Sequence, residues 1–324
     1  MIGSLNTAGE LLGFDCSLPW LTELIVEGSA GELDPSTGQD DSLHIVVEKA
    51  RTPFPTQSWE PLTRGAWTCA HDVVMENVCT SGLDLLLQTG SERPTFTFRW
   101  RPPTRDRILA RILRSRFHLL ARAVLVQYPA LWWAGTRGRV PLHASASATA
   151  QSTALVTAAS GIGRSTLLLG ELAAGGRATG DNLAVGDGAA VWGLVEPMRV
   201  DGGEGRRMPH GRNETAVPDR ARELTPDSLV VLRRDGRELS TVAPLGGAAA
   251  ARALVTNTYM AGELRRYWAF AATLAAGSGV GPAHPAIEDA AAAYAATLPC
   301  FTLTLGRRPG PRVAELLGAV EAAA

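Results

Sequence analysis

The chain has 324 residues, of which 45% are hydrophobic and 19% charged, and its formal net charge is −1 at pH 7. This length accommodates two domains with substantial cores, and the charge excludes the basic character typical of nucleic-acid-binding proteins. No charged start followed by an apolar run is present, and no apolar stretch approaches the length of a membrane span, so we expect no membrane partner. The four cysteines lack CxxC spacing, which favours reduced thiols in a cytoplasmic protein.

The first hundred residues are predicted to be rich in β-strands. Apolar runs of strand length occupy residues 43–47 and 83–87. Residues 95–100 alternate strictly, which places Phe96, Phe98 and Trp100 on one face of a strand. These patterns predict an N-terminal β-rich domain over residues 1–128, which ends in an arginine-faced helix.

That helix is predicted from about residue 105 to residue 125. Its apolar stripe consists of Ile108, Leu109, Ile112, Leu113, Phe117, Leu120 and Val124, and its other face carries Arg107, Arg111, Arg114 and Arg122. Two interpretations of the arginines remain open. One is a surface that docks an anion or a peptide, and the other is an ordinary solvated face.

A second pattern, over residues 153–174, predicts a strand, a glycine-containing turn and a helix. The turn reads Ala158-Ala159-Ser160-Gly161-Ile162-Gly163-Arg164-Ser165, and Thr166 follows it. Such turns bind phosphate because backbone N–H groups and the helix dipole face the anion. Relative to the Walker pattern, Ala158 replaces the first glycine and Arg164 replaces the lysine, whereas Gly163 and Ser165 match. An ordinary strand–turn–helix remains the alternative.

The arginine at position 164 suits the composition of the chain. Lys49 is the only lysine among the 31 basic Lys and Arg residues. A sequence with so few lysines could have changed from Lys to Arg at a site that needs only a cation. The substitution is not conservative in shape, because a planar guanidinium replaces a compact ammonium group.

Two residues flank the turn at informative spacings. His143 lies 21 residues before Arg164, and Asp181 lies 17 residues after it. Together with the Ser-Gly-Ile-Gly core, these positions resemble the kinase domain of HPr kinase/phosphorylase and its relatives, which include kinases encoded beside ribosomally made peptides such as lasso peptides. The resemblance covers residues 143 to 200.

The resemblance implies ATP and Mg²⁺ as cofactors. It implies a nucleotide site made of Ala158, Ser160, Gly161, Ile162, Gly163, Arg164, Ser165 and Thr166. Ser165 would bind Mg²⁺ together with Asn182, which replaces the second aspartate of the family. Arg164 would bridge the phosphates, Asp181 would take the proton from the acceptor hydroxyl, and His143 would lie near the phosphates.

The residue types also suit this chemistry directly. Phosphoryl transfer needs cations to neutralise charge on the γ-phosphate and a base to orient the attacking oxygen. Alternatives remain open: Asp181 as a turn residue in Gly-Asp-Asn, and His143 as a structural histidine at a strand end.

The rest of the chain is predicted to contain two hairpins followed by helices. The hairpins flank residues 186–188 and residues 235–236. Between them, residues 201–213 form a Gly-rich polar segment, predicted to be a flexible loop in which Arg206, Arg207 and Arg212 could clamp a phosphate. Helices are predicted within 248–276, over 288–296 and over 313–323, with a strand at 301–305.

We therefore expect a mixed α/β (α+β) protein in which an HPr-kinase-like P-loop kinase domain, residues 129–324, follows the β-rich domain. The expected activity is transfer of the γ-phosphate of ATP to a Ser or Thr hydroxyl of a peptide or small protein. The alternatives are a nucleotide-binding regulatory or scaffold module without catalysis, and a kinase for a small metabolite. The expected partners are a nucleotide and the acceptor, with homo-oligomerisation left open.

Overall fold

The computed structural model describes residues 2–36, 41–200, 202, 206–208, 211–282, 285–308, 313, 315 and 318. It shows a mixed α/β protein whose chain divides into two compact units. Unit 1 comprises Met1–Arg137, Val195–Thr215 and Arg266–Pro285, and unit 2 comprises Gly138–Leu194, Ala216–Arg265 and Ala286–Ala324. Compact units and sequence domains need not coincide, so the division after residue 128 stays a prediction. Over the described ranges, no helix has both the length and the hydropathy needed to cross a membrane.

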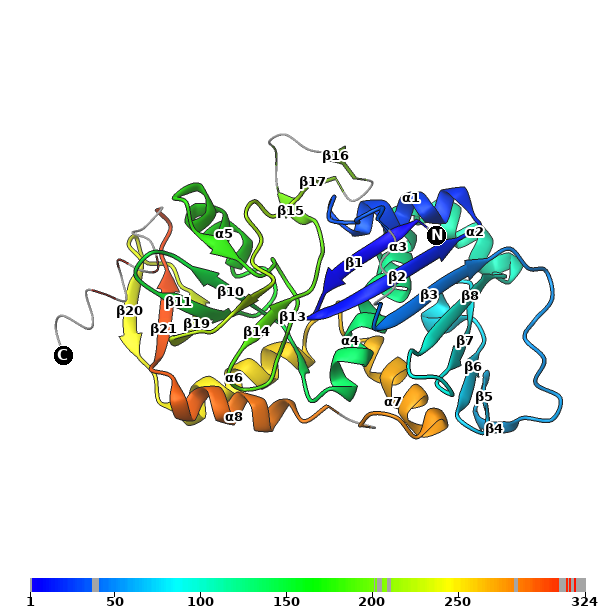
Figure 1. Ribbon diagram of the computed structural model, residues 1–324. Coiled ribbons are helices and arrows are strands. Elements are labelled where there is room, and N and C mark those ends of the chain that lie inside the picture. The colour runs from blue at the N-terminus through cyan, green and yellow to red at the C-terminus, as the bar shows by residue number, and fades with distance from the viewer. Residues whose placement is uncertain are drawn as a thin grey trace. The chain divides into compact units, whose positions relative to one another are not determined.

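The described residues of unit 1 form an eight-stranded sheet in the order β1-β2-β3-β8-β7-β6-β5-β4 (Figure 1). Its strands are β1 (Gly3–Thr7), β2 (Glu10–Cys16), β3 (Leu43–Glu48), β4 (Glu60–Thr63), β5 (Ala66–Cys69), β6 (Asp72–Met75), β7 (Leu83–Gln88) and β8 (Thr95–Trp100). β3 runs parallel to β2 and β8, and the other neighbouring strands are antiparallel. The predicted β-rich character of the first hundred residues is confirmed.

Strand β8 shows how alternation in the sequence produces a buried face. Phe96 and Phe98 are both fully buried, because alternate side chains of a strand point to the same side of the sheet. The Phe96 ring lies 5.5 Å from Trp132 of α4 (Tyr128–Thr136) and 6.4 Å from Phe270 of α7 (Tyr267–Ser278), measured between ring centroids. These two helices therefore supply aromatic side chains to the core of unit 1.

The predicted helix over residues 105–125 is interrupted. The structure has α2 (Thr104–Ile112), α3 (Arg114–Arg122) and a π-helical turn (Ala123–Gln127). Leu113, with φ −100° and ψ 51°, leaves the helical conformation and separates α2 from α3. No residue of α2 is buried, and Ile108 and Ile112 are 53% and 69% exposed. The expectation of one continuous apolar stripe was therefore wrong for the first half of the segment.

Unit 1 also contains smaller elements. These are α1 (Pro19–Gly28), a 3₁₀ turn (Val78–Thr80) and a three-stranded sheet of β15 (Met198–Val200), β17 (Asn213–Thr215) and β16 (Arg206–Arg207). The segment 201–213 was predicted to be a flexible loop, yet Arg206 pairs with Glu214 and Arg207 with Asn213 in short strands. Such a short strand among glycines gives no periodic signal. Residues 201, 203–205, 209 and 210 of that segment lie outside the described residues.

The described residues of unit 2 form a six-stranded sheet, β12-β10-β11-β19-β21-β20, and a four-stranded sheet, β18-β14-β13-β9 (Figure 1). The strands are β9 (Val140–Leu142), β10 (Ala144–Ala148), β11 (Thr153–Thr157), β12 (Arg177–Ala178), β13 (Ala184–Gly186), β14 (Val191–Gly193), β18 (Glu223–Leu224), β19 (Ser228–Arg234), β20 (Thr241–Pro244) and β21 (Cys300–Leu305). Strands β11, β19 and β21 are parallel, so their carboxyl ends meet at one edge of the sheet.

One predicted hairpin forms and the other does not. β13 pairs with β14 as expected. β19 and β20 are instead separated by β21, which is parallel to β19 and antiparallel to β20. The turn at Asp235-Gly236 fits a hairpin, but the apolar β21 gains more burial between the two strands, where Leu303 is fully buried. Over the residues that the structure describes, the helices of unit 2 are α5 (Arg164–Ala173), α6 (Gly247–Tyr259) and α8 (Ile287–Thr297). The helix predicted over 313–323 lies largely outside the described residues.

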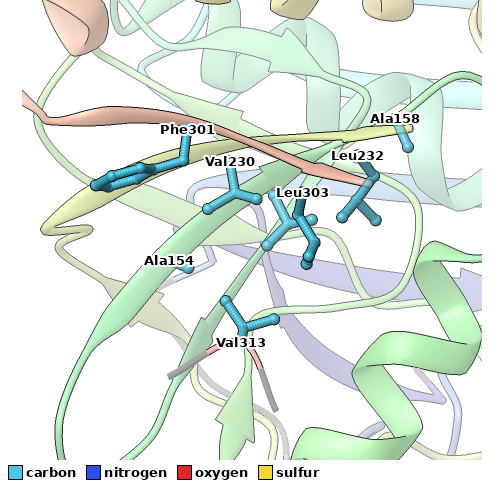
Figure 2. Close-up of a cluster of buried hydrophobic side chains, with 8 residues drawn as sticks. Ala154, Ala158, Val230, Leu232, Phe301, Leu303 and Val313 are labelled. Carbon is cyan, nitrogen blue, oxygen red and sulfur yellow. The ribbon is translucent and has the colours of Figure 1, made fainter. Parts of the chain in front are cut away.

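A hydrophobic cluster holds β11 against its parallel neighbours (Figure 2). Its buried members are Ala154, Val156, Ala158, Val230, Leu232, Phe301, Leu303 and Val313. Ile162 and Leu167 are partly buried and pack against it, so the segment after β11 is fastened to the core on both sides of Gly163.

Candidate functional site

The segment after β11 has the strand–turn–helix geometry that the sequence predicted. β11 ends at Thr157, and α5 begins at Arg164. Gly161 and Gly163 have φ angles of +81° and +117°, which residues with a β-carbon rarely adopt. Ala158, at the position of the first Walker glycine, has no positive φ. Its methyl group is therefore compatible with the turn, and the backbone path depends on two glycines.

The N-terminus of α5 is open to an anion. Gly163 is the N-cap residue, and no side chain caps the helix. The amide groups of a first helical turn have no partners within the helix, and the helix dipole favours negative charge there. Ser160, Gly161 and Thr166 are exposed and Ser165 is half-buried, so solvent reaches this turn. The Ile162 side chain packs on the core instead.

The Arg164 side chain turns away from solvent and is only 7% exposed. Its Nη1 donates to the main-chain oxygen of His143 over 2.9 Å, and its Nε donates to the main-chain oxygen of Asp181 over 3.1 Å. Its Nη2 lies 2.9 Å from His143 Nε2 and 3.2 Å from both the main-chain oxygen and Oδ1 of Asn182. Arg164 therefore brings together the upstream histidine and the downstream Asp-Asn pair. Its role in bridging phosphates stays a prediction.

His143 is buried between β9 and β10 and serves as an acceptor. Burial, and then the charge of Arg164, lower the pKa of His143 to about 3. Because Arg164 donates to Nε2, the neutral ring carries its proton on Nδ1. The main chain at His143 is fixed further by the hydroxyl groups of Thr157 and Thr258. A ring with so low a pKa is a weak base, and its Nε2 lone pair already accepts from Arg164, so we assign His143 a positioning role.

Asp181 follows a segment that is bonded firmly to β10. The Thr179 amide donates to the Ala146 oxygen over 2.9 Å, and the Ser145 hydroxyl donates to the Gly180 oxygen over 2.5 Å. Asp181 itself is only 1% exposed. A carboxylate enclosed by protein is more strongly coupled to nearby charge than one in water. Its position is thus determined by β10 on one side and Arg164 on the other.

The oxygen-rich donor set suits Mg²⁺ better than a softer metal. Ser165 offers a hydroxyl, Asp181 a carboxylate and Asn182 an amide oxygen, all hard ligands. Among the described residues, no group of three or more His, Cys, Asp or Glu side chains could hold a metal ion. Mg²⁺ commonly keeps several waters and binds through one or two protein groups plus phosphates, so oxygen ligands of this kind suit its chemistry.

One arginine near the turn was missed by the sequence analysis. Arg234 ends β19, and its Nη2 would lie 3.0 Å from a β-carbon at position 163. The sequence signal that could have identified it is the apolar run at residues 229–232, which Arg233 and Arg234 follow directly. Parallel pairing of that run with β11 would have placed these arginines at the edge that carries the turn.

The predicted substrate arginines belong to the other compact unit. Arg206 and Arg207 form β16, and Arg212 precedes β17, all within unit 1. Arg207 and Arg212 are exposed. Their proposed contact with a phosphate stays a prediction.

No protein-family model and no curated protein sequence matches the chain.

Proposed function

We propose that this protein is an ATP- and Mg²⁺-dependent kinase that transfers a phosphoryl group to a Ser or Thr hydroxyl of a peptide or small protein. One observation carries the proposal. The hydrogen-bonded set of His143, Arg164, Asp181 and Asn182 adjoins an uncapped, glycine-dependent strand–turn–helix at the carboxyl edge of parallel strands. The resemblance to HPr kinase/phosphorylase relatives supports the proposal through the spacings of His143, Arg164 and Asp181, although Arg164 and Asn182 replace the lysine and the second aspartate of that family.

Each residue has a role that its surroundings support. The amides from Ser160 to Ser165 bind phosphate oxygens, and the Ser165 hydroxyl and the Asn182 amide oxygen face Mg²⁺. Bound Mg²⁺–ATP supplies the phosphoryl group and neutralises part of its charge. Asp181 accepts the proton of the acceptor hydroxyl. Arg164 and His143 hold the Asp-Asn pair in place.

Two observations favour a second candidate, a module that binds nucleotide without catalysis. Asp181 is 1% exposed, and the amide oxygen of Asn182 accepts a hydrogen bond from Arg164. In that case Asp181 and Asn182 would only stabilise the fold, and the uncapped turn before α5 would still bind phosphate.

Two measurements separate these candidates. Calorimetry with Mg²⁺–ATP tests the turn, and transfer of γ-labelled phosphate to an array of Ser- and Thr-containing peptides tests catalysis. A kinase binds ATP and labels hydroxyl-containing peptides, and a binding module does only the first. No heat of binding at millimolar ATP would remove both proposals.

A further inference from the structure

We propose that Arg234, and not Arg164, is the guanidinium that contacts the phosphates of the bound nucleotide. The inference rests on the proposed nucleotide site and names a further binding residue for it. Arg164 occupies the position of the Walker lysine, but its N–H groups are directed to His143, Asp181 and Asn182. Contact with phosphate would require it to give up a buried set of hydrogen bonds, each costly to leave unsatisfied.

The topology of the sheet brings Arg234 to the turn. Thr157, the last residue of β11, pairs with Val231 of the parallel strand β19. β19 then continues through Leu232 and Arg233 to Arg234, so its end extends past the point where β11 becomes the turn. Leu232 is buried in the hydrophobic cluster and fixes the strand just before the two arginines (Figure 2).

Because Gly163 has no side chain, the guanidinium of Arg234 can lie close to its backbone. A β-carbon at position 163 would lie 3.0 Å from Nη2 and 3.7 Å from Cζ of Arg234. The guanidinium therefore lies directly beside the N-cap residue of α5. The first-turn amides that follow this residue are uncapped. An anion bound at those amides would meet the guanidinium as a second positive group, and the planar fork of arginine suits phosphate oxygens.

The charge of Arg234 is available to a ligand. Its side chain is exposed, and within the part of the chain that the structure describes it makes no hydrogen bond or ion pair. The adjacent carboxylate, Asp235, is paired with Arg237 at 2.8 Å. An exposed arginine whose acidic neighbour in the chain is already paired is suited to an incoming anion.

The test compares Arg234→Ala with Arg233→Ala as a matched control. Arg233 is the preceding residue of the same strand, is also exposed, and points to the opposite side of the sheet. We expect Arg234→Ala to weaken Mg²⁺–ATP binding by about tenfold or more, because the variant loses hydrogen bonds between two charged groups. Arg234→Lys should retain part of the affinity, and Arg233→Ala should bind like the wild type.

Thermal unfolding of each variant tests whether the substitution leaves the fold intact. Wild-type affinity in Arg234→Ala would overturn the inference and leave the proposed function standing. So would equal losses in Arg233→Ala and Arg234→Ala, which would indicate general electrostatic attraction. A wild-type protein that binds no nucleotide would remove the proposed function, and this inference with it.

Discussion

The Nε atom of Arg164 donates to the main-chain oxygen of Asp181 over 3.1 Å, although 17 residues separate them in the chain. The bond links the first residue of α5 to the segment that carries the proposed catalytic carboxylate. The acceptor is a main-chain atom, so this hydrogen bond does not depend on which side chain stands at position 181. Arginine at this position therefore has a structural reason beyond its charge.

Arg164→Lys should destabilise the protein. A lysine ammonium has three donors on one atom and cannot reach acceptors on His143, Asp181 and Asn182 together. We expect the free energy of unfolding to fall by about 2 kcal/mol or more, because buried acceptors lose their partners. Chemical denaturation measures this, with Arg233→Ala as a surface control. A fully stable Arg164→Lys protein that binds ATP more tightly would instead support a phosphate-bridging role.

Asp181→Asn should separate binding from catalysis. Asparagine keeps the size of the side chain but cannot accept a proton at the same position. We expect ATP affinity to stay within a few fold and phosphate transfer to fall by about 10²- to 10⁴-fold, the usual contribution of general base catalysis. If Asp181 only forms a turn, transfer by the variant should equal that of the wild type. If the protein is a binding module, neither form transfers phosphate.

The sequence predicted local elements well where periodicity and turn chemistry were strong. Strand β8, the β11–α5 junction and the β13–β14 hairpin all follow from short patterns. It failed where long-range pairing decided the outcome. The insertion of β21 between β19 and β20 depends on a strand about sixty residues downstream, and no local signal encodes it.

The same limit applied to the site. The spacings of His143, Arg164 and Asp181 suggested that they meet, but not that Arg164 would be the buried centre of the group. Spacing gives no information on whether a guanidinium faces a ligand or the protein. Arg234 was missed because its place beside Gly163 requires the parallel pairing of β19 with β11.

Gly163→Ala should impair the turn, whereas Gly170→Ala should not. The first change puts a β-carbon on a residue with φ +117° and 3.0 Å from Arg234. We expect it to cost about 1–3 kcal/mol of stability and to weaken ATP binding. Gly170 lies within α5, and a β-carbon there would meet no atom within 4 Å, so alanine should add up to about 1 kcal/mol. Calorimetric unfolding of both variants tests this, and equal effects would contradict it.

The neutral state of His143 should make stability depend on pH. In the folded protein, burial and the Arg164 charge lower its pKa to about 3, whereas an unfolded histidine titrates at about 6.5. Between these values the unfolded chain binds more protons, so the free energy of unfolding falls as the pH drops below about 6.5. The contribution approaches about 1.4 kcal/mol per pH unit.

The matched variant for this pH dependence is His143→Gln, which removes the titrating group while keeping an acceptor for Arg164. Urea denaturation between about pH 7 and pH 5 should therefore give a shallower pH slope for the variant than for the wild type. Equal slopes would show that His143 accepts a proton in the folded state and would contradict its assignment as a neutral acceptor.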